Sequence, residues 1–100
     1  MENQHRKISG YRELSQDEID LMNRIKAKGQ ELLLLQEELA DLLHKQQRLK
    51  CDAATDEPAK SAEFYRFMAA EPLHWAAIGK TDIQTGIMAL VRAVAQPDGC

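Results

Sequence analysis

A long, unbroken helical periodicity is the feature that most constrains the fold of this chain. Residues 15–50 contain no proline, and their apolar side chains recur at alternating spacings of three and four. Such spacing puts the side chains on one stripe of an α-helix, against which another helix can pack. The stripe consists of Leu21, Ile25, Leu32, Leu35, Leu39, Leu42 and Leu49, with Lys28 and Gln46 interrupting it. The sequence therefore predicts a long helix over residues 15–50 that uses this stripe as its packing seam.

The start of this helix has a well-defined signal. Ser15 and Glu18 have the S-x-x-E spacing of a capping box, in which each side chain accepts a hydrogen bond from the backbone N–H of the other. Leu14 and Ile19 hold the positions of a hydrophobic staple, which fixes how the preceding segment approaches the helix. We expect residues 1–14 to form an N-terminal arm that is anchored at its junction with the helix.

Gly29 is the weak point of the long helix, because glycine costs roughly 1 kcal/mol relative to alanine in a helix interior. It is a candidate for a bend between a short arm and a longer rod. Leu33, Leu34 and Leu43 widen the apolar face, so the helix is expected to contact more than one partner.

Residues 51–71 predict a loop and a short helix. The stretch from Cys51 to Ala59 has no apolar periodicity, and Thr55 or Asp56 is the expected cap of the short helix, with Pro58 in its first turn. A second long helix is expected over residues 72–96. Its apolar stripe consists of Leu73, Ala76, Lys80, Ile83, Ile87, Leu90 and Val94.

A second stripe of the C-terminal helix carries small residues, namely Gly79, Gly86 and Ala93, with Ala89 nearby. Small residues let another helix approach closely. Two interpretations are open: contact with another protomer, or packing within the chain against the helix that contains Phe64. In either case the pattern predicts an all-α fold, an antiparallel, coiled-coil-like helical hairpin with an N-terminal arm, forming a single domain that assembles into an oligomer.

Composition and charge exclude several classes of function. The chain has 100 residues and a net charge of −3, which argues against a basic nucleic-acid surface, so we expect no DNA binding. Its longest apolar run, Leu32 to Leu35, is too short for a membrane span, and we expect an intracellular protein without membrane contact. Cys51 and Cys100 lack paired spacing and are expected to be free thiols.

No spacing typical of catalysis or metal binding occurs in the sequence. His5, His44 and His74 share no metal-ligand spacing with one another or with either cysteine. Of the acidic residues Glu37, Glu38 and Asp41, only Asp41 has a histidine at i+3, and this single pair supplies too few ligands for a carboxylate-bridged metal site. The sequence predicts no enzyme, no catalytic residue, no bound metal and no cofactor.

Tyr11 and Lys26 each allow two interpretations. Tyr11 could cover the end of the core, or it could serve as a stacking platform for a purine. Lys26 could rest its aliphatic stem on the core with its amine in water, or it could contact a phosphate. Lys26 lies eleven residues beyond Ser15, roughly 16 Å along the helix axis. Tyr11 and Lys26 therefore meet one small ligand only if the arm folds back or if two protomers share the site.

Two blocks of sequence resemble a known family, the phage anti-CBASS cyclic-oligonucleotide sponges of type 2. The first block is GYRELSQDEIDLMN at residues 10–23, together with Lys26. The second block is WAAIGKTDIQTG at residues 75–86, continuing as MALVRAVAQP at residues 88–97. The blocks cover about half of the chain, and each is far more specific than a short motif.

The resemblance implies a small helical protein that assembles as a hexamer in the cytoplasm of the infected bacterial host. Members of the sponge family bind the cyclic oligonucleotides of antiphage signalling and sequester them without cleavage. Cyclic dinucleotides such as cGAMP would lie between paired protomers. Tyr11 and Lys26 match the principal contacts, and Gly10, Arg12 and Lys28 are secondary candidates.

Some members of that family also bind cyclic trinucleotides at separate sites. For such a site we take His74, Lys80 and Arg92 as candidates, because they carry nearly all the cationic capacity of the C-terminal helix. Histidine would be a weaker phosphate ligand than arginine. The competing hypothesis is a helical adaptor that binds a protein partner through the small-residue stripe and the acidic face.

Overall fold

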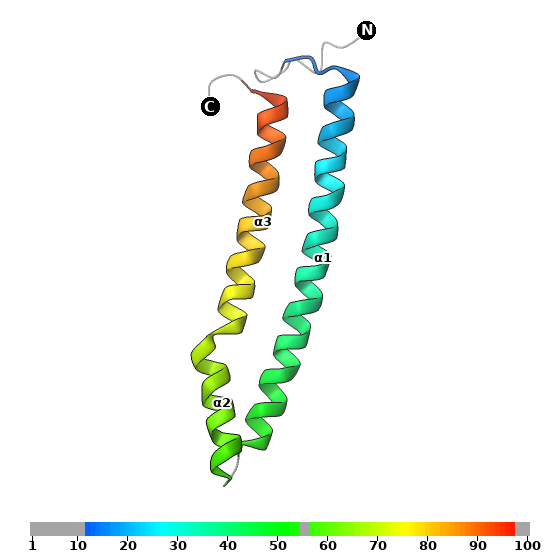
Figure 1. The fold of residues 1–100 in the computed structure, drawn as a ribbon. Coiled ribbons are helices and arrows are strands. Elements are labelled where there is room, and N and C mark those ends of the chain that lie inside the picture. The colour runs from blue at the N-terminus through cyan, green and yellow to red at the C-terminus, as the bar shows by residue number, and fades with distance from the viewer. Residues whose placement is uncertain (1–11, 55–56, 98–100) are drawn as a thin grey trace. The chain divides into compact units, whose positions relative to one another are not determined.

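Three helices contain most of the residues that the computed structural model describes, which are residues 12–54 and 57–97 (Figure 1). They are α1 (Gln16–Ala53), α2 (Pro58–Ala70) and α3 (Pro72–Ala95). No strand occurs among these described residues, which confirms the predicted all-α class. In the same part of the chain, no helix combines the length and the apolar character needed to cross a membrane.

Proline starts both of the later helices. Glu57 is the N-cap of α2 and its side chain makes no capping hydrogen bond, while Pro58 opens the helix. The expected cap at Thr55 or Asp56 is therefore wrong, and those two residues lie outside the described part of the chain. The physical reason is that proline has a helical φ and is favoured at the first position of a helix, so the residue directly before Pro58 becomes the N-cap. Pro72 opens α3 in the same way.

Glu71 separates α2 from α3 and adopts a left-handed conformation with φ of 52°. Its backbone N–H donates to the Met68 carbonyl at 3.1 Å, which closes the C-terminal end of α2. Its own carbonyl accepts from the N–H of Trp75 at 3.1 Å and so begins α3. A single residue therefore ends one helix and starts the next.

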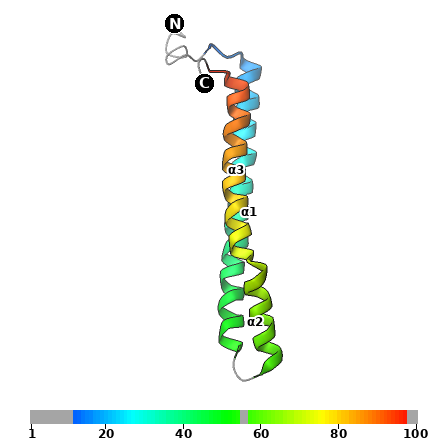
Figure 2. The same ribbon diagram turned by 90° about the vertical axis from the view of Figure 1, so that its left-hand side faces the viewer.

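The chain divides into two compact units, residues 1–32 with 83–100 and residues 33–82. In the first unit, the N-terminal part of α1 runs antiparallel to the C-terminal part of α3 (Figure 1). In the second unit, both views show α2 beside the C-terminal part of α1 (Figures 1 and 2). The buried residues are Gly29 and Ala95 in the first unit and Phe67 and Ala76 in the second.

Gly29 does not interrupt α1, which continues as a regular helix through this position. Gly29 is buried because the Ile87 side chain of α3 packs directly against it. A Cβ at position 29 would lie 2.2 Å from Ile87 Cδ1 and 2.5 Å from Ile87 Cγ1. The glycine thus permits a close approach of two helices within the first unit.

The packing seam of α1 is not the predicted leucine stripe. Leu21, Leu32, Leu35, Leu39, Leu42 and Leu49 are 47% to 59% exposed, and only Ile25 of the predicted stripe is half-buried. The covered positions of α1 are Glu18, Ile19, Met22, Ile25, Gly29, Leu33, Gln36, Ala40, Leu43, Gln46, Gln47 and Lys50. They too recur at spacings of three and four, but most of them lie one residue beyond the predicted stripe. The prediction was wrong because small residues such as Gly29 and Ala40 face the partner helices, while most of the leucines face outward.

The stripe of α3 was predicted more accurately. Ala76 is buried, and Leu73, Ile83, Ile87 and Val94 are half-buried, whereas Lys80 and Leu90 are exposed.

Among the residues that the structure describes, nothing packs closely against the two glycines of the small-residue stripe of α3. An added Cβ at Gly79 or Gly86 would meet no described atom within 4 Å. Ala89 and Ala93 are exposed. Of the two interpretations above, packing against α2 finds no support at the glycines, and contact with another protomer stays a prediction.

Candidate functional site

The capping box at the start of α1 is present as predicted. The Glu18 N–H donates to Ser15 Oγ at 3.2 Å, and the Ser15 N–H donates to Glu18 Oε1 at 2.9 Å. The Ser15 carbonyl accepts the first helical hydrogen bond, from the N–H of Ile19 at 3.0 Å. These three bonds fix the first turn of α1 and the backbone that enters it.

Arg12 connects this cap to the end of α3. Its Nη2 donates to Glu18 Oε2 in an ion pair, and also to the Val94 carbonyl at 2.8 Å. Because Val94 lies in the last turn of α3, its carbonyl has no partner in the helix, and a cationic donor is favourable there. The Arg12 Nε atom is buried and finds no acceptor in residues 12–54 and 57–97.

The carboxylate of Glu18 therefore accepts on both oxygens. The hydrogen bond from Arg12, followed by that from the Ser15 N–H, lowers the pKa of the Glu18 carboxyl from 4.5 to about 2. Hydrogen bonds to the ionised form favour that form, so Glu18 is a carboxylate over the whole physiological pH range.

The predicted dinucleotide contacts are only partly described by the structure. Tyr11 and Gly10 lie outside the described residues. Lys26 is on α1 in the first unit and its side chain is exposed. Lys28 is exposed too, and its Nζ lies 3.7 Å from Glu31 Oε1.

An open hollow of about 470 Å³ lies between α1 and α3 of the first unit. Its lining is mainly apolar, with two cationic residues of α1 among it. The lining residues are Leu21, Arg24, Ile25, Lys28, Gly29, Leu32, Ile83, Gly86, Ile87 and Leu90. Lys26 is not among them, although Ile25 and Lys28 are, so the predicted phosphate contact does not line this hollow.

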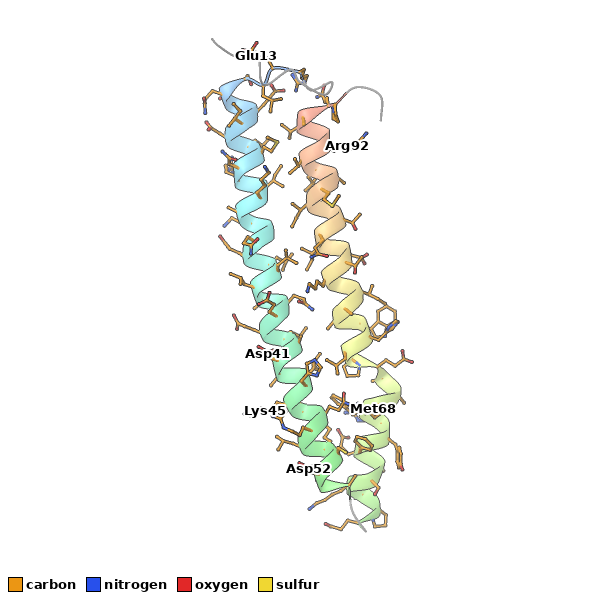
Figure 3. The ribbon with its side chains drawn as sticks, turned by 180° about the vertical axis from the view of Figure 1, so that it is seen from behind. Glu13, Asp41, Lys45, Asp52, Met68 and Arg92 are labelled. Atoms are coloured by element: carbon orange, nitrogen blue, oxygen red, sulfur yellow. The ribbon has the colours of Figure 1, made fainter. Side chains whose placement is uncertain are left out.

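The candidates for a trinucleotide site are divided between the two units. His74 and Lys80 belong to the second unit, and Arg92 belongs to the first, near the C-terminal end of α3 (Figure 3). His74 is exposed, with its ring edge against Trp75 at a centroid distance of 5.8 Å. Six residues separate His74 from Lys80, which places them about 120° apart around the helix.

Lys80 lines a second open hollow, of about 590 Å³, within the second unit. Glu37, Asp41 and His44 of α1 line the same hollow, and Gln36 Nε2 donates to the Ala76 carbonyl at 3.0 Å beside it. No group of metal ligands was found in the described part of the chain. The hollow combines both signs of charge, so it does not present a simple anion site.

Sequence reasoning missed two groups of polar contacts. The first is the link from Arg12 to Glu18 and Val94. Of these residues only Glu18 had a local sequence signal, which is its place in the capping box. The second is in the second unit, where Lys50 Nζ lies 2.9 Å from Glu63 Oε2 and Arg66 binds both oxygens of the Glu63 carboxylate at 2.7 Å. Hydrogen bonds from Arg66 and then Lys50 lower the pKa of Glu63 from 4.5 to about 2. The i,i+3 spacing of Glu63 and Arg66 is a recognisable sequence signal.

Comparison with known proteins identifies the family. The model of the Acb2/Tad1 hairpin domain matches residues 6–95. Anti-CBASS protein 2 of Pseudomonas phage JBD67 is 62% identical over an alignment of 108 positions that covers all of both chains. Both matches extend through the middle of the sequence, which the two resembling blocks did not cover. With its capped long helix and its antiparallel pairing of α1 and α3, this chain belongs to the Acb2/Tad1 hairpin-domain family.

Proposed function

We propose that this protein binds cyclic dinucleotide second messengers and sequesters them without cleavage, and thereby blocks CBASS antiphage signalling in the infected bacterium. The observation that carries the proposal is the end-to-end match, at 62% identity, to a phage protein named for its action against CBASS. A sponge needs sites in excess of the ligand and of Kd, and it needs no catalytic group.

In this proposal Tyr11 stacks on a base and Lys26 contacts a phosphate, with Gly10 and Lys28 as secondary contacts. The exposed position of Lys26 supports a role in binding, since its amine is accessible to a ligand. Because α1 is a continuous helix, Lys26 lies roughly 16 Å from the cap at Ser15. That separation favours a site completed by a second protomer, with two tyrosines and two lysines for two bases and two phosphates.

Oligomerisation, for which we propose a hexamer, is supported by the apolar surface of the single chain. Leu21, Leu32 and Leu90 of the first unit are about half exposed, as are Leu35, Leu39 and Leu42 of the second. Leucines at helical spacing that the described residues leave half exposed form a surface on which a helix of another protomer can pack.

A cyclic trinucleotide is the second proposed ligand, with His74, Lys80 and Arg92 as its candidate contacts. Glu37 and Asp41 share the hollow with Lys80, and their negative charges oppose a phosphate there. The proposed binding of cyclic dinucleotides does not depend on this second ligand.

Calorimetric titration with cyclic GMP–AMP tests the proposal. We expect stoichiometric binding by the wild type and a large loss of affinity in Tyr11→Ala and Lys26→Ala, with intact cyclic ligand recovered after denaturation. Asp17→Asn is a matched control on the same helix. Recovery of linear products, or equal binding by wild type and Tyr11→Ala, would contradict it.

The competing function is a protein-binding adaptor, which the exposure of Trp75 (64%) and Tyr65 (69%) in the second unit supports. A thermal melt separates the two functions. A ligand that binds only the native state raises the melting midpoint. The absence of any shift with saturating cyclic di- and trinucleotides favours the adaptor.

A further inference from the structure

The start of α1 and the end of α3 are joined through one carboxylate and one guanidinium. Glu18 accepts from the Ser15 N–H through Oε1 and from Arg12 through Oε2. Arg12 in turn reaches the carbonyl of Val94, 82 residues away in sequence. The arginine is thus held by two different elements of the first unit, immediately after the proposed stacking residue Tyr11.

We propose that Arg12 is a positioning residue: its contacts with Glu18 and Val94 fix the chain next to Tyr11, and Arg12 itself does not contact the ligand. The proposal rests on the proposed function, because it assigns a role within the same dinucleotide site. It replaces the secondary contact that sequence resemblance assigned to Arg12.

The charge of Arg12 is already compensated. The Glu18 carboxylate forms an ion pair with Nη2, and the two side chains are only 37% and 33% exposed. A phosphate that approached Arg12 would also approach Glu18, and the repulsion by that carboxylate would offset most of the attraction. The exposed Lys26 is a better phosphate contact for this reason.

The proposed consequence concerns the ligand-binding step. A residue bonded to an anchored Arg12 would have less conformational freedom to lose when a ligand binds. Ordering one residue costs about 1–2 kcal/mol. If Arg12 were not anchored, this cost would fall on the binding step and would lower the affinity roughly tenfold. Preorganisation of this kind strengthens binding without any new contact to the ligand.

Glu18→Gln tests the link without disturbing the cap. Glutamine is equally suited to the third position of a capping box, so the contact with Ser15 can persist while the ion pair to Arg12 is lost. Asp17→Asn is the charge-matched control, since Asp17 is an exposed carboxylate in the same first turn. Both variants remove one negative charge, which by itself favours an anionic ligand.

We expect Glu18→Gln to bind cyclic GMP–AMP about tenfold more weakly than wild type, and Asp17→Asn to bind as tightly as wild type or slightly more so. A direct phosphate contact by Arg12 predicts the opposite sign, because Glu18→Gln would then release Arg12 for the ligand. Equal or tighter binding by Glu18→Gln would overturn the proposal while the sponge function stood. Failure of the wild type to bind would instead refute the proposed function.

A double-mutant cycle separates positioning from a general loss of structure. If Glu18 and Arg12 act through Tyr11, Glu18→Gln has no further effect on affinity in a Tyr11→Ala background. The same holds for Arg12→Ala. A purely structural defect would weaken binding equally in both backgrounds, and that result would also overturn the proposal.

Discussion

Replacing Gly29 by alanine tests the close approach of α1 and α3 in the first unit. Alanine is favoured over glycine in a helix by about 1 kcal/mol. The new Cβ, however, would lie 2.2 Å from Ile87 Cδ1 and 2.5 Å from Cγ1, so the isoleucine or the helix must shift. Overpacking of this kind costs about 1–3 kcal/mol. We expect Gly29→Ala to destabilise the protein by a net amount of up to about 2 kcal/mol.

The effect of Gly29→Ala on stability should change sign when Ile87 is truncated. In an Ile87→Ala background, the Cβ of residue 87 is the only atom of that side chain near position 29, at 3.6 Å, which is ordinary contact. Gly29→Ala should then stabilise that variant by about 1 kcal/mol. Gly86→Ala is the matched control, because Gly86 is a helical glycine of the same unit whose Cβ would meet no atom of the described chain. It should stabilise the wild type by about 1 kcal/mol, whereas destabilisation by Gly86→Ala would support contact with another protomer at this glycine.

Urea denaturation followed by far-UV circular dichroism measures these differences. All variants are compared at one protein concentration, because the proposed assembly would make apparent stability depend on concentration. The unfolding free energies are comparable only where the m-values agree. If Gly29→Ala stabilises the wild type as much as Gly86→Ala does, the close contact with Ile87 is not the reason for the glycine.

Two further perturbations probe the ends of the helices and the ion pairs between them. Ser15→Ala removes the acceptor for the Glu18 N–H and should cost about 1 kcal/mol in urea denaturation, whereas Ser15→Asn should retain most of the stability. The pKa of Glu63 is depressed to about 2, so the stability from its pairs with Lys50 and Arg66 is present above the unfolded pKa of about 4.5. It is lost as the pH falls from there through 2. Glu63→Gln should therefore lose less stability than wild type between pH 5 and 2, and parallel acid-denaturation curves would contradict this assignment.

The local features of this fold could be predicted from the sequence, because their signals lie within a few residues of each other. The capping box joins Ser15 to Glu18 three residues later, and Pro58 and Pro72 mark helix starts through their own backbone geometry. These predictions needed no knowledge of what packs against the helix.

The orientation of α1 could not be predicted in the same way. Both the leucine stripe and the observed seam recur at spacings of three and four, so periodicity alone does not separate them. Hydrophobicity favoured the leucines, whereas the structure places Gly29 and Ala40 inward, where small size allows close approach. Part of the candidate site could not be predicted from the sequence for a related reason. The contact of Arg12 with Val94 spans 82 residues and leaves no mark on local sequence.

The hydrogen bond between Arg12 and Val94 also bears on how the ends of the two helices open. It brings the segment before α1 and the last turn of α3 within one side chain's length of each other in the first unit. Helix ends open locally more readily than helix interiors. Because one guanidinium contacts both the capping carboxylate of α1 and the last turn of α3, opening of either helix end removes a contact of the other.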